Sequence, residues 1–220
     1  MERSCSPTTA CSSWTSSPSS PARRSTLDAL RQPLEDGRVA IARARHSAVY
    51  PARFMLLAAT NPCPCGYAGE ADRCSCSEAD MARHRRRLSG PLLDRIDLLA
   101  NLARDGTSEP TPLTSSGRAR EQVMRARERQ AARLRADGVS LNAHMDARMA
   151  RRHVRLDDRG SEMMRAAREQ GLLSARGEHR VLRVARTIAD LNASEDIRAH
   201  DLGAALALRP DVGLAGSRAA

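Results

Sequence analysis

Four cysteines lie close together in the middle of the chain, and their spacing favours metal binding. Cys63 and Cys65 form a C-P-C pair, and after eight intervening residues Cys74 and Cys76 form a C-S-C pair. The intervening residues include two glycines, which allow the loop to bend. Four thiolates on one short loop suit a closed tetrahedral site, so we predict a structural zinc here. Redox-active or unliganded thiols are the alternative, because C-x-C is less specific than C-x-x-C.

Asn61 is a polar residue directly after an apolar stretch, and this position makes it a candidate functional residue. The continuous run from Phe54 to Thr60 predicts a buried strand of a parallel sheet. A side chain at the end of such a strand could orient an attacking water or touch a phosphate. Alternatively, Asn61 and Pro62 simply turn the chain.

Two arginines could also act on phosphate. Arg95, presented across a subunit interface, would neutralise charge that develops on a phosphoryl group. Alternatively, it pairs with Asp94 or Asp97 at the surface. Arg176 lies in the first turn of a helix that Ser174 should cap, and a cation at a helix N-terminus makes a phosphate site. A solvated arginine is the alternative there.

Basic residues gather at two further places. The alternating stretches of RVAIARARHSAVY predict a β-hairpin with Arg43, Arg45 and His46 near its tip. Arginines there could follow DNA phosphates without reading sequence, although an ordinary exposed hairpin is equally compatible. The charge run from His84 to Arg87 is more typical of a solvated helix face than of a DNA contact.

Composition limits the class of protein. The 36 basic residues are all Arg, and the net charge of +10 favours an anionic partner such as nucleic acid or nucleotide. No apolar run is long enough to span a membrane, and the N-terminus has no apolar signal-peptide core. We therefore expect a cytoplasmic protein without a membrane partner, in which disulfides are rare.

The candidate residues require two kinds of scaffold. STLDALRQPLEDG predicts a helix that ends at its glycine, MARHRRRL a basic helix, and SGPLLDRIDLLANLA a short helix leading into another strand. A Gly-, Pro-, Ser- and Thr-rich linker should separate this α/β part from a helical part whose long helix from Ser174 to Leu191 has an apolar face. The boundaries that we expect are 1–24 (disordered), 25–103 (α/β), 104–117 (linker), 118–210 (helical) and 211–220 (tail).

Four stretches together resemble the magnesium-chelatase-like AAA+ ATPases, in their ComM branch: LRQPLEDGRV, FMLLAATNPCPCG, RLSGPLLDRIDL and SARGEHRVLRVARTIADL. The resemblance covers residues 25–209. It implies an α/β fold, namely the C-terminal half of an AAA+ P-loop core followed by an all-helical lid. It further implies that Asn61 is sensor 1, Arg95 an arginine finger and Arg176 sensor 2, and that the hairpin tip faces the pore of a ring.

The same resemblance implies ATP and Mg²⁺ as cofactors, a homo-oligomeric ring, expected to be a hexamer, and DNA as partner. The predicted activity is ATP hydrolysis coupled to branch migration or remodelling of DNA in competence. The first alternative is a motor that inserts magnesium into a porphyrin. The NPCPCG loop favours the ComM branch over this alternative. The second is a zinc-stabilised nucleic-acid-binding module without enzymatic activity.

Two motifs of the family are missing from this sequence. A P-loop of the form G-x-x-x-x-G-K-[ST] needs a Lys, and the chain has none. The Walker B stretch expected before STLDALRQPLEDG is replaced by ACSSWTSSPSS. A one-base frame shift converts suitable codons for that stretch into GVLFLDELPEF. We therefore hypothesise that residues up to about Arg23 are translated out of frame, that Cys5 and Cys11 have no function, and that the chain alone is inactive.

Overall fold

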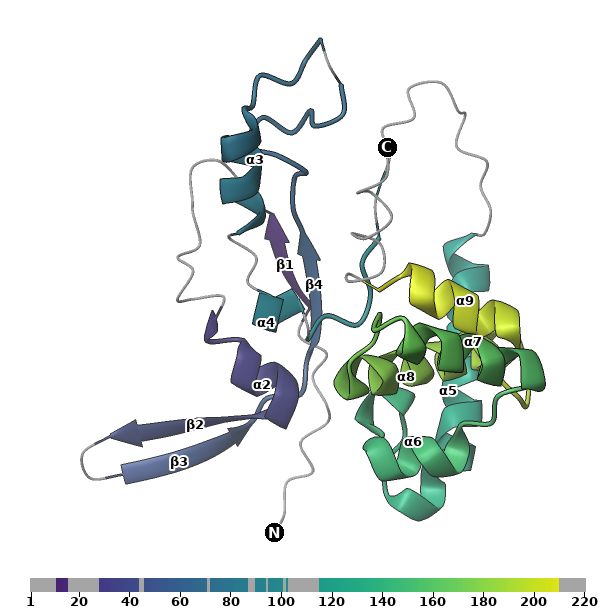
Figure 1. The fold of residues 1–220 in the computed structure, drawn as a ribbon. Coiled ribbons are helices and arrows are strands. Elements are labelled where there is room, and N and C mark those ends of the chain that lie inside the picture. The colour runs from purple at the N-terminus through teal and green to yellow at the C-terminus, as the bar shows by residue number, and fades with distance from the viewer. Residues whose placement is uncertain are drawn as a thin grey trace. The chain divides into compact units, whose positions relative to one another are not determined.

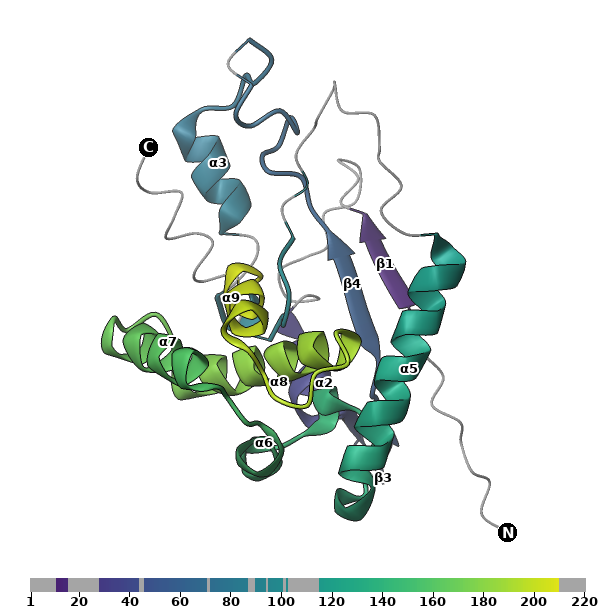
Figure 2. The same ribbon diagram turned by 90° about the vertical axis from the view of Figure 1, so that its right-hand side faces the viewer.

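The computed structural model describes residues 11–15, 28–43, 46–70, 72–86, 90–93, 95–100, 102 and 115–209. Two compact units divide the chain, Met1–Arg95 and Ile96–Ala220. The first contains both helices and strands, whereas the long regular elements of the second are helices (Figures 1 and 2). No helix in the described ranges is long and apolar enough to cross a membrane.

A parallel pair of strands underlies the first unit. β1 (Cys11–Thr15) pairs with β4 (Met55–Ala59), and Thr15 lies opposite Ala59 in the register. The structure thus differs from the expected disorder of 1–24 at β1, because pairing with β4 gives this Ser-rich segment partners for its backbone groups. β4 differs from the expected buried strand, since the side chains of Met55 and Leu57 are 57% and 59% exposed.

The predicted helix and hairpin are confirmed before β4. α2 (Arg31–Asp36) ends at Gly37, whose φ of 64° is the left-handed conformation that favours glycine at a helix end. β2 (Arg38–Arg43) and β3 (His46–Pro51) then form an antiparallel pair. The turn that joins them lies outside the described residues.

Two helices follow the cysteine loop. α3 (Glu78–Arg85) is the predicted basic helix, and α4 (Gly90–Leu93) is the predicted short one. The strand expected after α4 does not form in the described part of 95–102. Instead, the Leu99 backbone N–H donates to the Leu208 carbonyl at 2.8 Å, so this segment pairs with a helix end and not with a sheet.

The second unit is built of helices, as the sequence predicts. Its core comprises Met164, Val181, Ala185, Ala189, Ile197, Leu202 and Ala205. The apolar face of α8 supplies the middle of this core, although Leu191 at its end is 43% exposed. The helices are α5 (Ser116–Leu134), α6 (Ala147–His153), α7 (Asp158–Glu169), α8 (Ala175–Leu191) and α9 (Ala199–Ala207), with 3₁₀ turns η1 (Arg135–Asp137) and η2 (Asn142–His144).

A buried polar network joins α5, η2 and α8. The Asp190 carboxylate accepts two hydrogen bonds from Arg133, both at 2.7 Å, one from Asn142 at 2.8 Å and one from Arg186 at 3.1 Å. Burial lowers the pKa of Arg186, while the charge of Asp190 acts in the opposite direction. The Arg133 guanidinium thus joins α5 to α8, whereas Arg186 lies on α8 itself, four residues before Asp190.

Candidate metal centre and phosphate-site residues

The four predicted cysteine ligands converge on one point. Their Sγ atoms all lie within 4.8 Å of one another, and Cys63 is fully buried. The Sγ–Sγ distances are 3.3 Å from Cys63 to Cys65, 3.9 Å from Cys63 to Cys74, and 3.7 Å from Cys65 to Cys74. A tetrahedral zinc with Zn–S bonds of about 2.3 Å needs sulfurs about 3.8 Å apart. The donor set therefore fits a four-thiolate metal site.

The backbone of residues 63–76, which we call the knuckle, brings the two cysteine pairs together. The N–H of Gly66 donates to the Cys63 carbonyl at 3.1 Å, and the N–H of Cys74 to the Glu70 carbonyl at 2.8 Å. Gly66 has a φ of 84°, which a residue with a side chain adopts only with strain. These two backbone hydrogen bonds help to define the fold of the knuckle.

The thiols influence one another's ionisation. A hydrogen bond from the backbone of Tyr67, followed by one from the Cys63 thiol, lowers the pKa of Cys65 to about 6. At Cys76 a backbone hydrogen bond from Cys65 acts in the same direction, but the bond to the Cys65 sulfur and desolvation outweigh it and raise the pKa to about 12. One thiolate therefore forms readily, and ionisation of a second thiol beside it is opposed.

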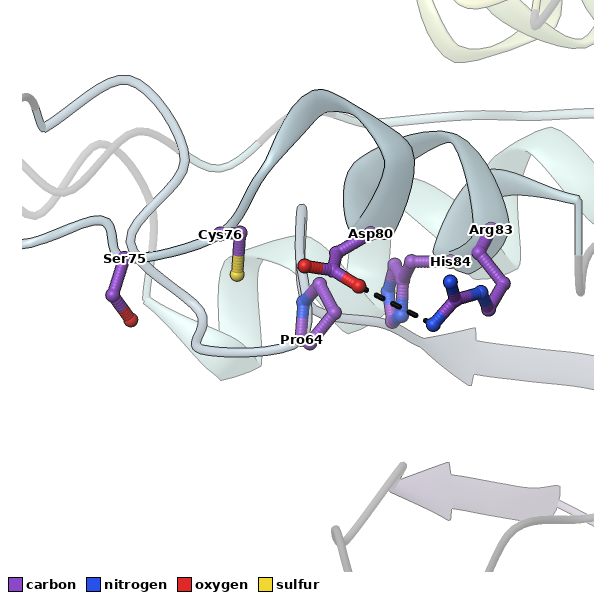
Figure 3. A pocket seen from close by; sticks show the side chains of 6 residues that line it. All are labelled: Pro64, Ser75, Cys76, Asp80, Arg83 and His84. Carbon is purple, nitrogen blue, oxygen red and sulfur yellow. Dashed lines mark hydrogen bonds and ion pairs between the residues drawn. The ribbon is translucent and has the colours of Figure 1, made fainter.

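Helix α3 begins directly after the last cysteine. The Ser77 hydroxyl accepts from the Asp80 backbone N–H at 3.2 Å, and the Asp80 carboxylate accepts from the Ser77 backbone N–H at 3.4 Å, which makes a capping box. The Ser77 hydrogen bonds lower the pKa of Asp80. A pocket of about 260 Å³ lies between α3 and the knuckle, lined by Pro64, Ser75, Cys76, Asp80, Arg83 and His84 (Figure 3).

Asn61 lies at the carboxyl end of β4, as predicted, and is exposed. Its backbone carbonyl accepts a hydrogen bond of 2.9 Å from Nε2 of His84 in α3. A Cβ added to Gly66 would lie 3.6 Å from the side-chain nitrogen of Asn61. The structure therefore brings Asn61 and the cysteines together, and it adds His84, which the sequence assigned to a solvated charge run.

Arg95 forms an ion pair that the sequence does not suggest. Its guanidinium donates to the carboxylate of Glu35 in α2, and its side chain is 15% exposed. The surface alternative named Asp94 or Asp97. Asp94 lies outside the described residues, and Asp97 pairs with Arg180 and Arg183 of α8 at 3.6 and 3.3 Å. No spacing signal points to Glu35, because it precedes Arg95 by 60 residues.

The remaining candidate residues belong to other elements. Arg176 is exposed in the first turn of α8, whose predicted cap is confirmed by a 3.0 Å bond from the Gly177 backbone N–H to the Ser174 hydroxyl. Arg43 and His46 are the last register pair of the hairpin. Arg45 lies outside the described residues, as do Cys5 and most of the expected linker.

Comparison with known proteins gives matches over most of the chain. The family model described as magnesium chelatase, subunit ChlI, matches residues 20–109, and the model of the ChlI C-terminal region matches 113–209. An uncharacterized protein of Mycobacterium tuberculosis is 42% identical over 187 residues. Competence protein ComM of Haemophilus influenzae is 39% identical over 196 residues, and the uncharacterized protein YifB of Escherichia coli 40% over 191. These matches cover 84 to 87% of this chain but only 37% of each relative.

Proposed function

Because this chain belongs to the magnesium-chelatase-like family, we propose that it supplies the sensor and lid portion of a ring-forming AAA+ ATPase. The proposed activity is ATP hydrolysis coupled to remodelling of DNA. The observation that carries the proposal is the position of Asn61, which follows β4 at the edge where the carboxyl ends of two parallel strands meet. Ligands of open α/β sheets bind at this edge.

Each candidate residue has a positioning role in this activity. Bound ATP with Mg²⁺ supplies the phosphoryl chemistry. Asn61 orients the attacking water, and Arg176 holds a phosphate at the N-terminus of α8. Arg95 neutralises developing charge on the nucleotide of a neighbouring subunit. Since Arg95 pairs with Glu35 within its own chain, ring assembly would exchange that carboxylate for phosphate oxygens.

The register of β1 supports the frame-shift hypothesis. In the shifted reading GVLFLDELPEF, the apolar VLFL falls on residues 11–14 and its acidic Asp on residue 15. These positions coincide with β1, and residue 15 pairs with Ala59, two residues before Asn61. A carboxylate there would share the strand-end edge with Asn61, which is where a metal-bound acid of the Walker B motif belongs. Codons incompatible with this shifted reading would refute the hypothesis.

Exposed apolar surface on β4 fits the same proposal. Met55 and Leu57 are more than half exposed although their strand is apolar throughout. A strand of this composition is typical of a parallel sheet covered on both faces. We infer that further core elements of the ATPase cover this surface in the working protein.

The nature of the partner follows from charge and relatedness. The net charge of +10 favours a polyanion, and one relative is named a competence protein. DNA is therefore the proposed partner, with the β2–β3 hairpin as its contact. Insertion of magnesium into a porphyrin and a purely zinc-stabilised nucleic-acid module remain the alternatives that the following experiment distinguishes.

The decisive experiment measures ATP turnover with and without DNA. The protein is prepared with its upstream coding region and restored frame, so that a P-loop is present, and compared with Asn61→Ala. DNA-stimulated turnover that Asn61→Ala abolishes, with nucleotide binding retained, would support the proposal. The chain as printed, which has no Lys, should not hydrolyse ATP. Absence of nucleotide binding by the restored protein would refute the proposal and favour the non-enzymatic module.

A further inference from the structure

We propose that His84 is a positioning residue for Asn61, and that the metal-bound knuckle anchors the helix that carries it. The inference deepens the proposed function, on which it rests for the role of Asn61 as a sensor. The contact between His84 and Asn61 itself does not depend on that role. The metal site, helix α3 and the segment after β4 would then hold one another in fixed positions.

The donor and the acceptor of the hydrogen bond between His84 and Asn61 can be assigned. A backbone carbonyl oxygen only accepts, so the His84 Nε2 that lies 2.9 Å from it must carry the proton and donate. His84 lies in the last turn of α3, and its side chain is half-buried. The bond spans 23 residues of sequence and joins α3 directly to Asn61, two residues after the end of β4.

The knuckle ties both partners of this contact to the same four sulfurs. Cys63 comes two residues after Asn61, and Cys76 comes immediately before Ser77, the N-cap of α3. A metal on these thiols would hold together the sulfurs of Cys63 and Cys76, which lie within 4.8 Å of each other, and so tie the segment after β4 to the beginning of α3. The His84 hydrogen bond then closes a ring of contacts that runs from metal to α3, to Asn61 and back to Cys63. Closing a loop in this way removes conformational entropy that the open segment would keep.

The knuckle also lies near the side chain of Asn61. A Cβ added to Gly66 would lie 3.6 Å from the amide nitrogen of Asn61 and 3.8 Å from its amide carbon. His84 thus holds the backbone of Asn61 from α3, while the knuckle lies beside its side chain. Precision matters at this place, because a displacement of about 1 Å costs on the order of 10²-fold in a reaction that depends on positioning.

The test uses NMR spectroscopy of the zinc-loaded chain as printed, which needs no nucleotide. His84→Leu removes the donor while keeping an apolar side chain, and His84→Gln restores a nitrogen donor. Arg85→Gln changes an exposed neighbour on the same helix and is the control. His84→Leu should shift the backbone and side-chain amide signals of Asn61 and speed amide exchange over residues 61–66, with zinc content unchanged. His84→Gln should return these signals towards the wild type, and Arg85→Gln should leave them in place.

Unmoved Asn61 signals in His84→Leu, or equal shifts in Arg85→Gln, would overturn the inference. Chelation of the zinc should shift the same Asn61 signals in the wild type, and a knuckle that loses its metal without affecting Asn61 would likewise overturn it. In the longer protein, His84→Leu should lower turnover on the order of 10-fold with nucleotide binding retained. If Asn61→Ala has no effect on turnover, the proposed role of Asn61 as a sensor is refuted. The NMR result would still decide whether His84 positions Asn61.

Discussion

Asp190 is a single side chain on which the structure of the helical unit depends. It is 1% exposed and is the shared acceptor for Arg133, Asn142 and Arg186. Arg186 is equally buried and also donates to the carbonyls of Ser194 and Glu195. Removal of the carboxylate would leave buried positive charge without its main compensation.

We therefore expect Asp190→Ala to lower the free energy of unfolding by about 3–5 kcal/mol, as for a buried pair that loses one partner. Urea unfolding followed by helical circular dichroism measures this change. Glu169→Ala is the control, because Glu169 is exposed and lies 3.9 Å from Arg165, so its loss should cost about 0.5 kcal/mol or less. Equal costs for the two variants would contradict the role of the network.

The knuckle is the element whose structure agrees most closely with the prediction from its sequence. Its cysteine spacing predicts a tetrahedral site, and the sulfur distances fit one. The lowered pKa of Cys65 means that this thiol is largely ionised at neutral pH and takes up a proton as the pH falls through about 6. Protons and metal therefore compete for the same sulfurs.

From this competition we expect about one zinc per chain at pH 7.5 and progressive release as the pH is lowered. The sign follows from the lowered pKa: stabilisation by the thiolate is present at higher pH and is lost as the pH falls through the folded value. Metal analysis after gel filtration at each pH gives the stoichiometry, and Cys63→Ser should release zinc at a higher pH than the wild type. Four freely titratable thiols at pH 7.5 would exclude the site.

The hairpin is the second element with a testable role. Arg43→Ala with Arg45→Ala should weaken DNA binding and reduce the slope of log K against log salt by about 2, because each arginine neutralises about one phosphate. The matched control is Arg120→Ala with Arg127→Ala on exposed positions of α5. Arg129 does not serve as a control, since it donates to the Asp190 carbonyl at 2.8 Å. Equal losses from both pairs would indicate general basicity and no dedicated contact.

At the scale of the assembled molecule, the proposal depends on residues supplied by different subunits. Arg95 would act on a neighbour's nucleotide, whereas Asn61 and Arg176 would act on the nucleotide of their own chain. Asp97, two residues after Arg95, is bound by Arg180 and Arg183 of the helix that carries Arg176. The segment after the candidate finger is therefore fixed to α8.

We expect Arg95→Ala in the restored longer protein to abolish turnover while ATP binding persists. Mixing these subunits with subunits that lack the P-loop Lys should recover part of the turnover, because some interfaces then combine an intact P-loop with an intact arginine. Steady-state ATPase assays on co-assembled rings measure the recovery. No recovery despite proven co-assembly would show that Arg95 does not act in trans.

Several features of this protein were determined by the sequence itself because their signals are local. Gly37 marks the end of α2, Ser174 caps α8, and the alternation around Arg43 specifies the hairpin. The paired cysteines likewise needed only their spacing to be identified as a common site. In each case the residues that decide the structure lie within one turn, one hairpin or one short loop of each other.

Only the tertiary structure decided the contacts that join distant segments. His84 reaches Asn61 across 23 residues, Arg95 reaches Glu35 across 60, and Arg183 reaches Asp97 across 86. Charge runs and Asp–Arg spacings look alike whether the side chains are solvated or paired, so composition does not reveal the partner. These ion pairs and hydrogen bonds depend on how elements meet in space, because electrostatic contacts act over a few ångströms irrespective of distance along the chain.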